Sequence, residues 1–137
     1  MRRLSAFLRD ERSMNKNRPV FLDLWRIRLP ITGWASILHR ISGVLLVLTI
    51  PYAVYLFGLS LSGPAGFADA ASRLSSGFAR GLLLVLAWSF LHHLFAGIRF
   101  LMLDLGLGID RTSARKSAWA AISAAVAVAL IGWGIRP

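Results

Sequence analysis

The chain has 137 residues, of which 56% are apolar and only 16% are charged. So few charged residues cannot cover the surface of a water-soluble domain, and the composition therefore indicates a membrane protein. The sequence contains no cysteine, which excludes disulfides, thiolate-ligated iron–sulfur clusters, covalently attached c-type haem and a cysteine nucleophile from this chain.

The formal net charge is +10, which in a soluble protein would suggest a nucleic-acid partner. However, nine of the sixteen lysines and arginines lie between Arg2 and Arg40, ahead of the first uncharged apolar run. A basic segment next to a membrane span is the ordinary positive-inside signal. No nucleic-acid partner is therefore expected.

Residues 1–33 are expected to form a cytoplasmic and interfacial segment. The beginning of the chain lacks an apolar core and carries Asp10 and Glu11, which fits neither a secretory signal nor a transit peptide. Pro19 and Pro30 prevent one long helix, while the tryptophans nearby suit a membrane interface. We therefore expect this segment to lie along the membrane surface.

Residues 34–137 are expected to form a membrane domain. Three apolar runs are each about 18 to 21 residues long, which is the length that crosses a hydrocarbon core of about 30 Å. No segment shows the alternating pattern of a membrane β-barrel. The sequence predicts an all-α membrane protein with three transmembrane helices, at about 34–61, 78–104 and 116–135.

The connections between these spans differ in charge. Gly63, Pro64 and Gly66 end the first helix and predict a short loop or a surface helix. The second connection carries more basic residues, including Arg111 and Arg115. Because lysine and arginine gather on the cytoplasmic side, the N-terminus and the second connection are expected in the cytoplasm and the C-terminus outside.

One polar face is expected at the cytoplasmic end of the first span. On a helix Ser36, His39, Arg40 and Gly43 fall at positions i, i+3, i+4 and i+7. Their hydroxyl, imidazole and guanidinium groups suit a carbonyl or carboxylate ligand just below the interface. The alternative is that Arg40 extends to lipid phosphates and that His39 simply lies at the boundary. The residue types alone favour neither.

A second polar face is expected near the centre of the second span. His93, Gly97, Phe100 and Asp104 fall at i, i+4, i+7 and i+11. His93 lies about 16 Å before the end of this helix, where a neutral, metal-bound imidazole is stable. Gly97 leaves room for a flat macrocycle, so haem iron is the candidate. The alternative is a structural histidine bonded to a neighbouring helix.

The chain is expected to supply only one of the two axial ligands of such an iron. His92 points about 100° away from His93 around the helix and aligns instead with Arg99. His39 belongs to another helix and is expected near the interface. The second ligand is therefore expected from another chain.

Two stretches resemble a known family. "RPVFLDLWRIRLPITGWASILHRISGVLL" resembles the signature of the cytochrome b membrane-anchor subunit of succinate dehydrogenase (respiratory complex II), and "HHLFAGIRFLMLDLG" resembles that family's second motif. The resemblance covers about Arg18 to Gly106, and the stretch "LDLWRIRLPIT" is similar to the sequences of bacterial members of the family. One departure is Phe100, which stands where the family usually has a histidine.

The resemblance implies half of a heterodimeric haem-binding bundle in the bacterial inner membrane. The implied partners are a second membrane-anchor subunit, an iron–sulfur subunit, a flavoprotein subunit and membrane lipids. Flavin and iron–sulfur clusters in the soluble subunits would pass electrons from succinate to ubiquinone during aerobic respiration.

The resemblance also implies roles for individual residues. His93 matches the axial ligand of haem b, Ser36 and Arg40 match quinone-site residues, and His39 and Arg40 are implied near the haem propionates. Two alternatives remain. One is a haem-free structural anchor of the same complex, and the other is a small transporter subunit in which His92, His93 and Arg99 line a proton or anion path.

Overall fold

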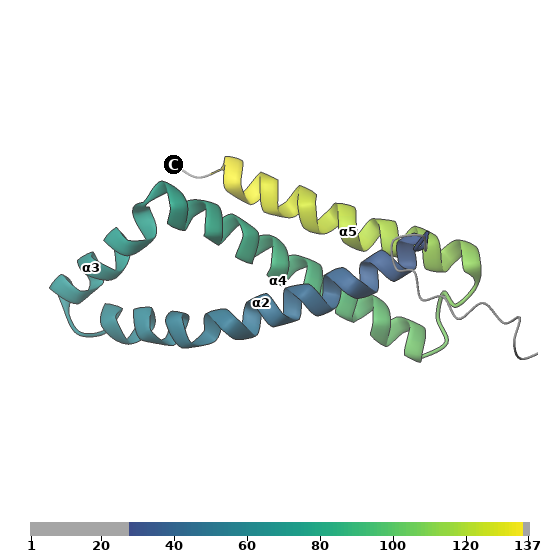
Figure 1. Cartoon of the computed structure of the whole chain (residues 1–137), viewed down its shortest axis with the longest axis horizontal. Coiled ribbons are helices and arrows are strands. Elements are labelled where there is room, and N and C mark those ends of the chain that lie inside the picture. The colour runs from purple at the N-terminus through teal and green to yellow at the C-terminus, as the bar shows by residue number, and fades with distance from the viewer. Residues whose placement is uncertain (1–27, 136–137) are drawn as a thin grey trace, which may run out of the picture.

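The computed structural model describes residues 28–135 of the chain. It contains the helices α2 (Ile31–Ser60), α3 (Pro64–Ser75), α4 (Gly77–Asp104) and α5 (Arg111–Gly134), and no strand occurs in this part of the chain (Figure 1). Helices α2, α4 and α5 are each long and apolar enough to cross a membrane. The predicted all-α membrane fold with three spans is confirmed, whereas most of the predicted interfacial segment lies outside the described residues.

The three long helices are packed unevenly. Helix α5 runs back beside α4, whereas α2 crosses α4 and then diverges from it, and α3 joins the diverging ends (Figure 1). The buried residues of α2, Ala35 and Ser42, both lie in its first half. The second half of α2 exposes large apolar side chains, including Val47, Leu48 and Phe57. This surface suits lipid or another membrane helix.

The buried core of the described residues consists mainly of small side chains. Four alanines of α5 form one stripe, at Ala118, Ala121, Ala125 and Ala129. Small residues let helix backbones approach closely, and van der Waals contact then holds helices together in lipid. The same core contains two ionisable side chains of α4, His92 and Arg99.

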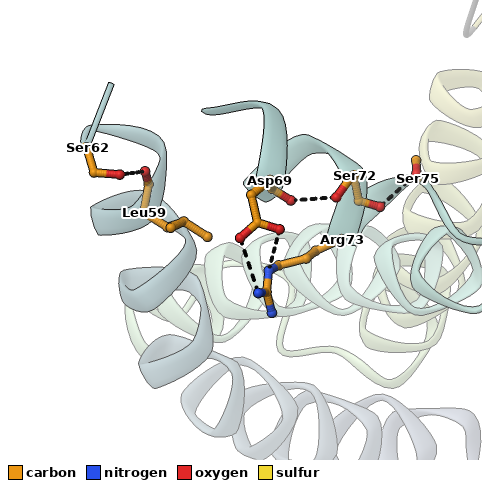
Figure 2. A network of polar contacts seen from close by, with 6 residues as sticks. All are labelled: Leu59, Ser62, Asp69, Ser72, Arg73 and Ser75. Atoms are coloured by element: carbon orange, nitrogen blue, oxygen red, sulfur yellow. Dashed lines mark hydrogen bonds and ion pairs between the residues drawn. The ribbon is translucent and has the colours of Figure 1, made fainter. Parts of the chain in front are cut away.

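The connection between α2 and α4 is a polar surface helix, one of the two forms predicted for it. In α3, Nε of Arg73 lies 3.2 Å from Oδ1 of Asp69, and Asp69 holds the pKa of Arg73 above its ordinary value. The hydroxyls of Ser62 and Ser72 donate to carbonyls three residues earlier (Figure 2). These polar side chains are exposed, and each makes a hydrogen bond within this connection or with the end of α2.

Helix α5 begins five residues before the span predicted from hydropathy. The carboxylate of Asp110 accepts a hydrogen bond of 2.8 Å from the backbone N–H of Ser113, which is an N-cap. Because a cap, and not the start of the apolar run, decides where a helix begins, the basic residues Arg111 and Arg115 are helical. Gly108 turns the chain just before the cap with a φ of 71°.

Candidate functional site

The imidazoles of His39 and His93 are in contact where α2 crosses α4. Their ring centroids are 4.0 Å apart and the planes differ by 10°. Sequence reasoning placed His39 a whole helix away from His93, and this contact shows that the expected separation was wrong. Periodicity gives the face on which a residue lies, whereas the crossing point of two helices depends on where small residues let them approach.

A hydrogen bond determines which ring nitrogen of His93 carries a proton. Nδ1 of His93 lies 3.1 Å from the backbone carbonyl oxygen of His39. A carbonyl oxygen only accepts, so Nδ1 must donate. In the neutral ring Nε2 then keeps its lone pair, as a metal ligand requires.

A buried serine completes this arrangement. The hydroxyl of Ser42 donates to the same His39 carbonyl at 2.8 Å, and its oxygen lies 3.2 Å from Nδ1 of His93. Sequence reasoning did not identify Ser42. Its position three residues after His39 and directly before Gly43 was the available signal.

The glycine that admits His93 belongs to α2. A Cβ atom at Gly43 would lie 2.9 Å from Cε1 of His93, closer than ordinary contacts allow. Gly97, which sequence reasoning matched to a macrocycle, faces His39 instead, and a Cβ there would lie 3.5 Å from Nε2 of His39. The close approach of α2 to the imidazole therefore depends on Gly43.

The donor set fits half of a two-ligand haem site. Between residues 28 and 135 no group of three or more His, Asp or Glu side chains could hold a metal ion. Stacked imidazoles present their nitrogens side by side, whereas two axial ligands must face each other across the iron. His39 and His93 would therefore not ligate one iron together, and a ligand from another chain would complete such a site.

On the same helix, Ser36 lies one turn before His39 and Arg40 directly follows it. Ser36 is half-buried and Arg40 is exposed. Within residues 28–135 neither side chain makes a hydrogen bond or ion pair. By contrast, Arg73 and Arg99 both bond to other residues. The hydroxyl and the guanidinium are thus available to a ligand outside this chain.

His92 and Arg99 lie on the packed inner face of α4. The ring of His92 is fully buried and stacks on Trp88, with centroids 5.4 Å apart. Nε of Arg99 donates to Oγ of Ser117 at 3.0 Å, and Nη2 donates to the carbonyl of Ala114 at 3.2 Å. Arg99 thereby links α4 to the start of α5.

Phe100 packs against this group of side chains as an apolar ring. It packs against the ring of His39 in a T-shaped contact, with centroids 5.2 Å apart and planes at 70°, and the guanidinium of Arg99 lies 5.3 Å from its centroid. His39 is therefore held between His93 and Phe100. The residue that departs from the usual family pattern serves here as a packing surface for His39.

Comparisons with known proteins cover most of the chain. Residues 14–132 match the family described as the succinate dehydrogenase/fumarate reductase transmembrane subunit. The succinate dehydrogenase cytochrome b556 subunit of Coxiella burnetii is 35% identical over 121 residues, which is 87% of this chain and 97% of that protein. The subunit of the same name from Paracoccus denitrificans is 33% identical over 84% of this chain and 88% of its own length. The cytochrome b560 subunit of Reclinomonas americana is 29% identical, covering 88% of each chain.

Proposed function

The chain belongs to the family of succinate dehydrogenase/fumarate reductase transmembrane subunits, and on that basis we propose that His93 ligates a haem b and that Ser36 and Arg40 help to bind ubiquinone. The chain is the membrane-anchor cytochrome b subunit of a succinate dehydrogenase and so forms part of an enzyme complex. The family predicted from the two sequence motifs is confirmed.

The hydrogen bond between His93 and the His39 carbonyl carries the proposal for haem. It places the proton on Nδ1, so Nε2 is the nitrogen that binds iron. A bound haem supplies a one-electron store close to the quinone site. A second iron ligand would come from the second membrane-anchor subunit.

The proposal for the quinone rests on Ser36 and Arg40, which have no partner among residues 28–135. A quinone carbonyl accepts hydrogen bonds, and its oxygen gains negative charge as electrons arrive. The hydroxyl of Ser36 donates to one carbonyl, and the permanent charge of Arg40 stabilises the reduced oxygen. Two electrons and two protons complete the conversion to quinol.

The haem propionates are proposed to lie near His39 and Arg40. An arginine and an imidazole at the end of a membrane span offset carboxylate charge in a region where water is scarce. The contacts of His39 with His93 and Phe100 hold its ring in one position. The two proposed ligands, haem and quinone, thus share one end of α2.

The assembly is proposed to contain a second membrane-anchor subunit, an iron–sulfur subunit and a flavoprotein subunit, in a bacterial inner membrane. The starts of α2 and α5 lie at the same end of the bundle, since Ile31, Thr32, Arg111 and Arg115 line one surface hollow. The basic residues at this end favour a cytoplasmic side, with the C-terminus in the periplasm. The soluble subunits dock at this end.

The test uses the intact complex purified from membranes. We expect a b-type reduced-minus-oxidised spectrum and succinate-driven reduction of a short-chain ubiquinone. A complex that reduces quinone without any haem absorbance would instead be anchored by a haem-free subunit. Proton or anion flux through the chain alone in proteoliposomes would support the transporter alternative and contradict the proposal.

A further inference from the structure

Two serines hold side chains of α4 in the same way. Ser42 on α2 donates to the carbonyl three residues earlier and approaches His93, which bonds to that same carbonyl. On α5, the hydroxyl of Ser117 donates to the carbonyl of Ala114 and accepts a hydrogen bond from Arg99. Arg99 also donates to the same carbonyl. Each of the two serines therefore belongs to a closed triangle made of its hydroxyl, a backbone carbonyl and a side chain of α4.

Most other serines of the described chain lack such a triangle. The hydroxyls of Ser60, Ser62 and Ser72 each donate to the carbonyl three residues earlier, and none of these bonds joins two helices. Ser42 and Ser89 are by contrast fully buried, and of these two only the hydroxyl of Ser42 has hydrogen-bond partners within residues 28–135. Burying a hydroxyl is costly unless both its proton and its lone pair find partners. In Ser42 the His39 carbonyl takes the proton, and Nδ1–H of His93 meets the oxygen.

The triangle permits only one tautomer of His93. With the proton on Nδ1, the N–H is shared between two acceptors, 3.1 Å and 3.2 Å away. With the proton on Nε2, the Nδ1 lone pair would face the carbonyl lone pair at the same 3.1 Å, and that contact is repulsive. A second acceptor from a different direction also fixes the plane of the ring, as one bond alone would not.

We propose that Ser42 is a positioning residue that, with the His39 carbonyl, fixes the tautomer and ring plane of His93 and so sets its strength as an iron ligand. This inference rests on the proposed function, since it concerns the residue proposed to bind haem. Hydrogen bonding at Nδ1 makes Nε2 a stronger electron donor. A stronger donor favours ferric over ferrous iron, so Ser42 lowers the haem reduction potential.

The test compares Ser42→Ala with Ser117→Ala in the intact complex. Both changes remove one hydroxyl from an interhelical triangle, but only the first touches the proposed ligand. For Ser42→Ala we expect a higher haem midpoint potential and a broadened low-spin ferric EPR signal. We also expect haem to transfer to added apomyoglobin about tenfold faster. That factor is the lower end of the loss in metal affinity that typically follows removal of a residue hydrogen-bonded to a metal ligand. For Ser117→Ala we expect the wild-type potential and EPR signal.

The outcomes separate this inference from the proposed function. A wild-type complex without haem would overturn the role of His93 itself. A wild-type complex with haem, and a Ser42→Ala complex with the same potential, EPR signal and haem loss, would overturn only the role of Ser42. Equal changes in Ser42→Ala and Ser117→Ala would also overturn it, because they would reflect a loosened bundle.

Discussion

His39 and His93 are 54 positions apart in the sequence, yet their rings lie 4.0 Å apart and nearly parallel. The contact arises because α2 and α4 cross where Gly43 leaves space for the imidazole of His93. One helix thus supplies the proposed iron ligand, and the other supplies the backbone carbonyl that orients it. The strength of the proposed haem site therefore depends on how closely α2 and α4 pack.

Gly43→Ala should disturb this packing. Its Cβ would lie 2.9 Å from Cε1 of His93, so the ring or the helix must shift. Forcing an extra methyl group into a packed site typically costs about 1–3 kcal/mol. We expect a lower thermal unfolding temperature and reduced haem content of the purified complex.

Gly58→Ala is the matched control for this change, since nothing lies within 4 Å of a Cβ at that position of α2. It should leave haem content unchanged. Equal haem content in the Gly43→Ala and Gly58→Ala complexes would show that the approach of α2 to His93 does not matter for the haem.

Arg40→Leu should separate quinone reduction from succinate oxidation. Loss of a hydrogen bond from a charged donor typically costs about 1.5–3 kcal/mol, so succinate:ubiquinone reductase activity should fall roughly 10- to 100-fold. Reduction of a soluble dye by succinate should persist, because it draws electrons before they reach the membrane. Arg80→Leu, which removes an exposed arginine at the other end of the bundle, should leave both activities unchanged.

Ser36→Ala should have a smaller effect of the same kind. A neutral hydrogen bond contributes about 0.5–1.5 kcal/mol, which corresponds to roughly a 3- to 10-fold loss of quinone reductase activity. Inhibition by a quinone-site inhibitor should weaken in parallel. An unaltered rate and an unaltered inhibition constant would remove Ser36 from the proposed quinone site.

The N-cap of α5 should make stability depend on pH. The N–H of Ser113 lowers the pKa of Asp110 below its ordinary value of 3.8. A carboxyl with a lowered folded-state pKa stabilises the fold above its unfolded pKa, and that contribution is lost as pH falls through the folded value. The thermal unfolding temperature should therefore decrease below about pH 4.

Variants of Asp110 isolate this contribution. Asp110→Asn keeps a capping oxygen and removes the titration, so it should weaken the pH dependence. Asp110→Ala removes the cap and should lower the unfolding temperature at neutral pH. If the acid sensitivity of Asp110→Asn matched that of the wild type, the cap would not be its source.

Much of the fold follows from local sequence properties. The lengths of the three apolar runs predicted the spans, because a helix needs about 20 apolar residues to cross a membrane. Helical periodicity placed Ser36, His39 and Arg40 together on α2 and His93 on α4. Both properties depend only on residues close in sequence.

Contacts between helices were harder to predict. The stacking of His39 on His93 depends on where α2 and α4 cross, and no periodicity encodes that position. The role of Ser42 depends on the same crossing. Hydropathy predicted where the third span begins but not where its helix begins, because the start of α5 is set by a single capping carboxylate, Asp110. A second axial ligand is not expected within this chain at all.

The proposal that His93 binds haem iron through Nε2 is tested most directly by His93→Leu in the intact complex. The reduced-minus-oxidised spectrum and the extracted haem content should be measured beside a His92→Gln control, which alters the adjacent histidine. We predict that His93→Leu loses the b-type absorbance or shifts it to that of a high-spin haem, while His92→Gln retains the wild-type band position. A wild-type low-spin spectrum in His93→Leu would contradict the proposed ligation.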